Sequence, residues 1–231
     1  MAALVGGERS IAQSVPSRQR FAFETRTELE AQAKLADAKA DKGQAYLIRY
    51  RLEHGDFQDG DRIVISIRGA AGVNDTLTVR TGKRLELPQM ADLSLDGVLR
   101  SELLPRLTAH VAKYLRDPVV RATPLVRVGI LGTVVRPGFY YVSADLPLSD
   151  VLMSAGGPGA EADLEKVTVR RGSDVIVDAS NTRVALTEGI SLDMLHLRAG
   201  DEINVGKEKH FNWGVVVPSA AAILGLVITI T

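Results

Sequence analysis

The sequence has no cysteine, few aromatic residues and no surplus of charge of either sign. The absence of Cys excludes disulfides, thiolate nucleophiles, Cys-ligated zinc and an N-terminal cysteine that carries a lipid. The aromatic residues are five Phe, five Tyr and one Trp, which is few for a protein that grips sugars or bases by stacking. Lys plus Arg and Asp plus Glu are 28 each, which argues against a dedicated nucleic-acid binder because such proteins need surplus cations.

Catalytic motifs are also missing. The four His residues are scattered, and the chain contains no H-E-x-x-H, G-x-S-x-G or P-loop sequence. The close acidic pairs Asp59/Asp61 and Asp201/Glu202 have the chemistry to hold a cation or to exchange protons. Each pair precedes a predicted strand beside a Gly, so turn formation accounts for it. We therefore expect no catalytic residue, no metal site and no cofactor.

The chain has 231 residues, of which 45% are hydrophobic and 24% charged, as in a folded protein with one large or two modest domains. Near the N-terminus, Thr25 and Glu28 have the spacing of a capping box and predict a helix over 24–41 that stops at Gly43. A second helix is expected over 45–53. Both helices are weakly apolar, which favours a solvated hairpin or spacer, with a partner-binding arm as the alternative.

The next part of the sequence predicts strands and then a long helix. β-Branched residues predict strands over 62–68, 77–80 and 84–87, the last closed by Pro88. Apolar residues spaced three and four apart then predict a helix from Ser94, as N-cap, to Asp117-Pro118. Pro105 cannot donate to the Ser101 carbonyl, so we expect a kink or a break there.

The second half predicts short strands and one short helix. An extended run over 119–130 leads into a hairpin whose return strand is 139–142. A helix over 148–155 is expected to stop at Gly156-Gly157, and strands follow over 167–170, 175–178 and 203–205. This order predicts an α+β fold with a sheet partly covered by one helix.

The last nineteen residues, 213–231, contain no charged side chain. As a helix at ~1.5 Å per residue they would span roughly 28 Å, close to the ~30 Å hydrocarbon thickness of a bilayer. Charged residues at 207–210 and the aromatic Phe211 and Trp213 precede them, which is typical of a membrane boundary. The sequence therefore predicts a C-terminal membrane segment over 208–231, with a buried C-terminal strand or helix as the alternative.

The sequence of this apolar segment has features of both a strand and a helix. Alternating residues from Leu224 to Thr231 have the period of a strand, whereas Pro218-Ser219 suits a helix start. On a helix, small side chains would share one face and allow close packing in lipid. We favour the helix. The small residues of that face are Ser219, Ala222, Gly225 and Thr229.

The order of motifs resembles that of the bacterial outer-membrane polysaccharide export proteins. In the first half the resemblance rests on Gly60-Asp61 and the strand after it, on Leu85-Glu-Leu87-Pro88, and on Tyr114-Leu-Arg-Asp117-Pro118. The second half is similar to their SLBB domain, a soluble-ligand-binding β-grasp fold. The residues that carry this second likeness are Gly132, Arg136, Pro137, Gly138, Gly156, Gly157, Gly200 and Asp201.

The resemblance implies a small export-type domain of strands and helix over 56–122 and one SLBB-like β-grasp domain over 123–207. The remaining parts are an N-terminal segment with two helices over 1–55 and the membrane segment over 208–231. Long members of the family carry more than one SLBB unit. The single unit here implies a shorter ring or a different way of reaching a partner.

By this likeness, copies of the chain form a ring in the bacterial outer membrane, with their other domains in the periplasm. Their C-terminal segments jointly line a passage for a secreted polysaccharide, and an inner-membrane polysaccharide co-polymerase is the implied partner. The alternative is a tail-anchored periplasmic glycan-binding or scaffold module without a pore. The residues expected in the membrane or pore segment are Trp213, Pro218, Ser219, Ala222, Gly225, Thr229 and Thr231.

Overall fold

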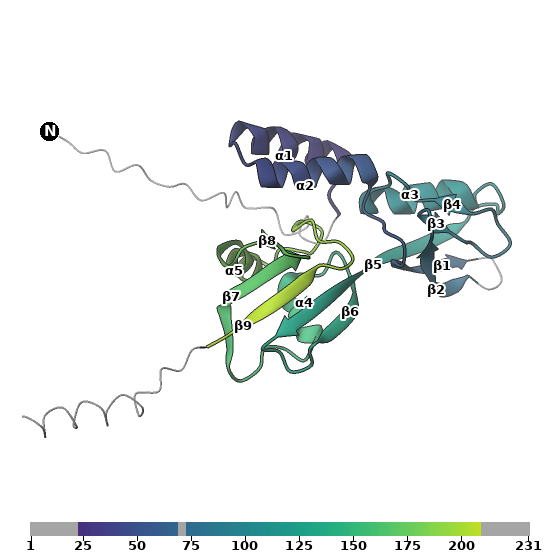
Figure 1. The fold of residues 1–231 in the computed structure, drawn as a ribbon. Coiled ribbons are helices and arrows are strands. Elements are labelled where there is room, and N and C mark those ends of the chain that lie inside the picture. The colour runs from purple at the N-terminus through teal and green to yellow at the C-terminus, as the bar shows by residue number, and fades with distance from the viewer. Residues whose placement is uncertain (1–22, 69–72, 209–231) are drawn as a thin grey trace, which may run out of the picture.

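The computed structural model describes residues 23–68 and 73–208, which form five helices and nine strands (Figure 1). Apart from residue 208, the predicted membrane segment lies outside the described residues, and so do all of its named positions from Trp213 to Thr231. None of the helices in the described ranges combines the length and the apolarity needed to cross a bilayer.

The N-terminal helices are α1 (Arg26–Ala38) and α2 (Lys42–His54). The predicted capping box is confirmed, because the Thr25 backbone N–H donates to Glu28 Oε2 at 2.8 Å and the Thr25 side chain accepts from the Glu28 N–H. The prediction that Gly43 stops the first helix is wrong. Gly43 lies in the first turn of α2, whose N-cap is Asp41, and the chain reverses at Ala40 with φ 57°.

The two helices are not solvated on all sides, so the interpretation as a solvated hairpin is wrong. Leu29 and Ala33 of α1 face Ile48 of α2, and these residues are buried in a small core with Leu99. The helices therefore belong to the packed body of the protein. Their low average apolarity hid this, because the buried stripe on each helix is narrow.

The first part of the sheet consists of β1 (Arg62–Arg68), β2 (Asn74–Arg80), β3 (Arg84–Leu85) and β4 (Leu93–Ser94), each antiparallel to the next. Helix α3 (Arg100–Val111) packs on it. Ile63, Ile65 and Ile67 alternate with exposed residues along β1 and share one core with Leu103 and Leu107 of α3. The predicted strand positions are thus confirmed, with the third one shorter than expected.

The predicted helix start at Ser94 is wrong. Ser94 lies in β4 opposite Arg84, and α3 begins at Arg100, with the Glu102 carboxylate accepting from the Leu99 N–H at 3.0 Å. Of the kink or break predicted at Pro105, the break is wrong, since Pro105 lies inside one continuous helix, and the kink stays a prediction. Burial of the apolar face of α3 offsets the hydrogen bond that Pro105 removes.

The second half contains β5 (Val119–Gly132), β6 (Gly138–Ser143), α4 (Leu148–Ser154), β7 (Ala162–Arg171), β8 (Asp174–Val177), α5 (Ala179–Glu188) and β9 (Glu202–Lys207). The predicted hairpin, short helix and final strand are confirmed. Helix α5 was not predicted, although its capping residues are visible in the sequence. Asp178 accepts from the Asn181 N–H, and Gly189 ends the helix in the left-handed conformation.

Strand β5 joins the two halves (Figure 1). It pairs with β1 over 119–125, with β6 over 125–130 and, in parallel, with β9 over 129–132. The pairing order is β4-β3-β2-β1-β5-β9-β7-β8, with β6 also on β5. The predicted α+β class is confirmed. The predicted domain boundary at 122/123 falls inside this single strand.

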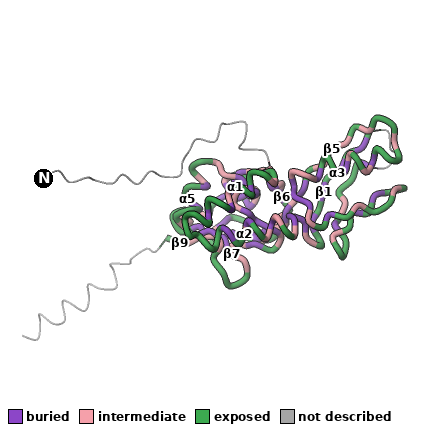
Figure 2. The backbone as a smooth tube through the Cα atoms, turned by 90° about the horizontal axis from the view of Figure 1, so that it is seen from above, coloured by how far each residue is buried: buried purple, intermediate pink, exposed green. Residues whose placement is uncertain are grey.

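The sheet is buried on one face and open on the other. Along β5, Val126, Val128 and Ile130 are buried in the core of the second half. Val120 and Ala122 pack against the core that β1 shares with α3. These even-numbered residues all lie on one side of the strand. Exposed odd-numbered residues such as Arg121 and Thr123 lie on the other side, which we call the open face. Figure 2 shows the alternation of buried and exposed backbone in both halves.

Candidate functional site

The loop between β5 and β6 is held by two other segments of the second half. The Thr133 N–H donates to the Val205 carbonyl at 2.9 Å, the Val135 N–H to the Gly157 carbonyl at 3.1 Å, and the Arg136 N–H to the Ala155 carbonyl at 2.9 Å. The structure therefore brings the predicted motif residues 132–138 and 156–157 together. They form one loop cluster next to the C-terminal end of α4.

The glycines of this cluster are required by close backbone packing. Gly132 has φ +81°, and a Cβ there would lie 2.2 Å from the Val205 carbonyl oxygen. Gly156 has φ +83°, and a Cβ there would lie 3.0 Å from the Cβ of Val135. Helix α4 ends at Ser154, just before them. The interpretation of Gly156-Gly157 as a helix stop is confirmed.

We expect Gly132→Ala to destabilise the protein by about 2 kcal/mol more than Gly200→Ala, because overpacking adds to the strain of a positive φ. Gly200 is the matched control, since its φ is +90° but nothing lies within 4 Å of its Cβ position. Urea denaturation followed by circular dichroism measures both variants. Equal losses of stability would contradict a packing role for Gly132.

The other motif residues lie in separate turns. Gly60 (φ 91°) and Asp61 precede β1, and Pro88 lies in the turn after Leu87. The turn before β5 contains Asp117 (φ 49°) and Pro118. Gly200 lies in the turn before β9. The structure therefore does not bring all the predicted motif residues into one site.

The predicted acidic pairs support turns. Asp61 Oδ2 accepts from the Gln58 N–H at 2.9 Å, and Asp59 accepts from the backbone N–H groups of Gly82 and Lys83. Burial raises the pKa of Asp61 to about 6. In the other pair, the Asp201 carboxylate accepts two hydrogen bonds from the Arg171 guanidinium, each of 2.8 Å.

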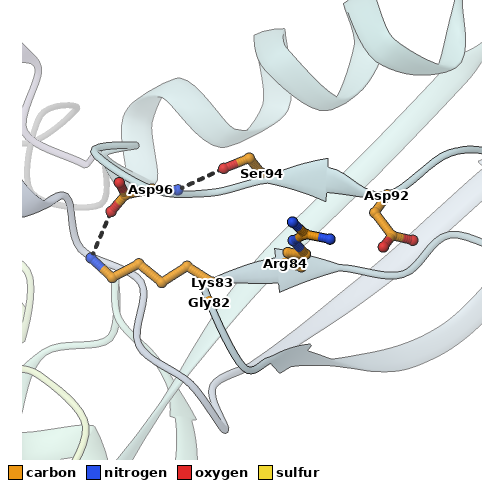
Figure 3. A pocket seen from close by; sticks show the side chains of 6 residues that line it. All are labelled: Gly82, Lys83, Arg84, Asp92, Ser94 and Asp96. Carbon is orange, nitrogen blue, oxygen red and sulfur yellow. Dashed lines mark hydrogen bonds and ion pairs between the residues drawn. The ribbon is translucent and has the colours of Figure 1, made fainter.

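An exposed cleft of about 550 Å³ lies beside β3 and β4 (Figure 3). The side chains that line it are polar or charged, and Lys83 Nζ lies 3.2 Å from Asp96 Oδ1 on one side, with Arg84 and Asp92 toward the other. Such groups can hydrogen-bond sugar hydroxyls or pair with a small acid. Sequence reasoning missed this cleft because its residues come from two short segments that only the β3–β4 pairing brings together. The described residues contain no group of three or more His, Asp or Glu side chains placed to hold a metal.

A buried cluster of charged residues connects the N-terminal helices to both halves of the sheet. We call it the ionic joint; its members are Glu24, Arg51, Asp56, Arg100, Asp193 and His196. Arg51 is 1% exposed and is its centre. Its guanidinium lies 2.7 Å from Asp56 Oδ1, 2.8 Å from Glu24 Oε2 and 2.8 Å from Asp193 Oδ1.

Arg100 and His196 complete the ionic joint. Arg100 Nη1 lies 2.7 Å from Asp193 Oδ1, and the Arg100 backbone N–H donates to Asp56 Oδ2 at 3.0 Å. Arg51 Nη1 lies 2.6 Å from His196 Nδ1. Because a guanidinium only donates, Nδ1 is the acceptor and the proton is on Nε2. The joint thus links residues far apart in the sequence through one guanidinium.

Burial and charge act in opposite directions on the carboxylates of the ionic joint. Burial alone would raise the pKa of Asp56, but Arg51 and Arg100 lower it to about 2. Burial raises the pKa of Glu24 to about 7, against the attraction of Arg51. Burial and then Arg51 lower the pKa of His196 to about 3, so its imidazole is neutral. Two guanidinium groups thus face three carboxylates, and Glu24 is the carboxylate of the three whose pKa is raised.

Sequence reasoning missed the ionic joint, in which Asp56 is 2% exposed and paired with Arg51. One signal was available. Arg51 follows Ala45 and Ile48 at a spacing of three, so it lies on the buried stripe of α2.

Two aromatic side chains of β6 lie on the open face and are stacked with arginines. The Arg127 guanidinium carbon lies 4.0 Å from the ring centre of Phe139, and that of Arg62 lies 4.0 Å from the ring centre of Tyr141. Phe139 is 53% exposed and Tyr141 36%. These pairs join β1, β5 and β6 on the solvent side of the sheet. Sequence reasoning did not predict these pairs, because they depend on strand register.

Residues 127–185 match the SLBB domain family, a domain that occurs in polysaccharide export proteins. The match runs from the second half of β5 through β6, α4, β7 and β8 into α5, and the mixed strand and helix structure there is consistent with a β-grasp-like SLBB domain. No curated protein matches the chain. The predicted resemblance of the second half to an SLBB domain is confirmed.

Proposed function

We propose that this protein is a ring-forming component of a bacterial polysaccharide export system in the outer membrane. The SLBB match over residues 127–185 is the observation that carries the proposal. The predicted export-type motifs before it and the apolar residues after it support it, because they occur in the order found in the export family. The protein acts in this proposal as a conduit and not as an enzyme.

Transport of a hydrophilic polymer requires several copies of the chain. One apolar segment cannot enclose water, so the passage needs a ring in which small or polar side chains of residues 213–231 face inward. The few aromatic residues are consistent with weak and repeated contacts, which a passage needs in order to release its cargo. The other domains would lie in the periplasm, where an inner-membrane polysaccharide co-polymerase is the proposed partner.

A second candidate function is a tail-anchored periplasmic glycan-binding or scaffold module without a pore. The exposed polar cleft beside β3 and β4 favours it, because such a cleft suits hydroxyl groups without any need for a ring. The two candidates differ in the number of subunits that must assemble.

We expect the full chain, purified in mild detergent, to form a large particle of one size with a central opening. Light scattering coupled to size exclusion gives its mass, and electron microscopy of single particles gives its shape. A chain that ends at residue 208 is the control and should be soluble without detergent. A full chain that stays monomeric over a wide concentration range would exclude the ring and leave the scaffold module.

A further inference from the structure

The open face of the sheet carries most of its charge as arginine. Strand register places paired residues on the same face, and Arg80 is opposite Arg84, Arg121 opposite Ser66, and Arg62 opposite Leu125. Alternation along β1 and β5 adds two more arginines. Arg170 of β7 lies on this face as well, opposite Glu202. The arginines of this face on strands β1, β2, β3 and β5 are Arg62, Arg68, Arg80, Arg84, Arg121 and Arg127.

Few carboxylates balance these arginines. Glu86 lies 3.4 Å from Arg80, and Glu202 of β9, opposite Gly129, is on the same face. Within residues 23–68 and 73–208, no carboxylate lies within 4 Å of the guanidinium groups of Arg62, Arg68, Arg84, Arg121 and Arg127. The open face therefore carries more arginines than carboxylates, although the whole chain has a formal charge of zero. A surface of this kind attracts an extended anion.

The geometry of the face suits carboxylates that lie along a chain. Arg62 and Arg127 are held against the rings of Tyr141 and Phe139, which leaves the edge of each guanidinium free to form paired hydrogen bonds. Between the arginines lie small polar side chains such as Thr76, Thr78 and Thr123, which protrude little from the sheet.

The face continues to the cleft in Figure 3. Arg84 and Ser94 belong to both, because they are paired across β3 and β4 and both line the cleft. The cleft therefore adjoins the open face at its β3–β4 end.

We propose that the open face binds an acidic polysaccharide through its carboxylate groups, with Arg62, Arg121 and Arg127 as the central contacts. This inference rests on the proposed function in taking a polysaccharide as the cargo, and adds that the cargo carries uronic acids. One guanidinium lies over each of the rings of Phe139 and Tyr141, which leaves less ring surface for the stacking of nucleic-acid bases.

The test is calorimetric titration of the full chain in detergent with alginate oligosaccharides, which are polymers of uronic acid. We expect binding that weakens as salt rises, and no heat with dextran of the same length, which carries no charge. Arg62→Gln/Arg121→Gln/Arg127→Gln should reduce the affinity for alginate at least tenfold. Equal binding of dextran, or unchanged affinity of this variant, would overturn the proposal.

The control variant Arg49→Gln/Arg106→Gln/Arg116→Gln loses the same charge from exposed positions off the open face, and should change the affinity less than twofold. Arg68 and Arg121 contact neither aromatic ring, so the variant Arg68→Gln/Arg121→Gln keeps both ring contacts. It should still weaken alginate binding, which shows that the loss of affinity does not come from a disrupted fold. Single-stranded DNA and anionic lipid vesicles are the competing anions. Tighter binding of either than of alginate would overturn the proposal.

The outcome is independent of the ring. Alginate binding by a monomer would leave this inference intact while the ring fails. A ring that does not bind alginate would contradict this inference alone.

Discussion

Arg51→Met should lower the melting temperature of the protein by roughly 10 °C, the largest effect that we expect from any single substitution. Methionine fills much of the same volume but leaves Glu24, Asp56 and Asp193 without the cation that they share. Removal of one partner from a buried ion pair typically costs about 3–5 kcal/mol, since the remaining charges stay desolvated. Thermal unfolding of the full chain in mild detergent, followed by circular dichroism, measures the shift.

Arg49→Met is the matched control for Arg51→Met. Arg49 lies on the same helix and pairs with Asp37, but both side chains are about half exposed or more, at 60% and 46%. An exposed pair of this kind contributes well under ~1 kcal/mol, so this variant should unfold close to the wild-type temperature. Similar shifts in the two variants would show that the ionic joint is not what holds the helices to the sheet.

Glu24→Gln should make the protein more stable than wild type at pH 8 and no more stable at pH 4.5. The folded-state pKa of Glu24 is about 7, above the ordinary value of 4.5. The contribution of Glu24 to stability is therefore complete below pH 4.5 and is lost as the pH rises through 7. This corresponds to about 3 kcal/mol across that window, since one pKa unit equals about 1.4 kcal/mol. Glutamine mimics the protonated acid and removes the loss.

Urea denaturation at a series of pH values measures the difference between Glu24→Gln and wild type. His196 and Asp56 contribute to both proteins, so their pH dependence largely cancels in that difference. Gln32, whose amide donates to Glu24 Oε1 at 2.6 Å, can turn over to accept from the new amide. Glu30→Gln, at an exposed position of α1, is the control and should leave the pH profile unchanged. A constant difference from pH 4.5 to 8 would contradict a buried excess proton on Glu24.

The sequence predicted the elements whose signals are local. Alternation along 62–68, the capping box at Thr25 and the Gly-rich stop after 148–155 each depend on residues within one element, and the structure confirms all three. The SLBB resemblance of the second half was also correct, since residues 127–185 match that domain.

The errors arose where distant residues decide the local structure. Ser94 has the character of an N-cap, but pairing with Arg84 places it in a strand and delays the helix to Arg100. Helix α2 looked solvated because its buried stripe contains Arg51, a residue whose burial is possible only with three carboxylates brought from elsewhere. Strand register likewise determines that Arg62 and Arg127 share one surface, and no local pattern reports register.

The sharing of β5 by both halves has a consequence for how the sequence can vary. Side chains on a strand alternate with period two, so insertion or deletion of one residue reverses the direction of every side chain beyond it. If the residues of β5 before Thr123 keep their places, such a change near Thr123 would turn Val126, Val128 and Ile130 outward and Arg127 inward. Length variation in this protein is therefore expected in the loops that flank β5, while the strand itself tolerates substitutions but not a change in the number of its residues.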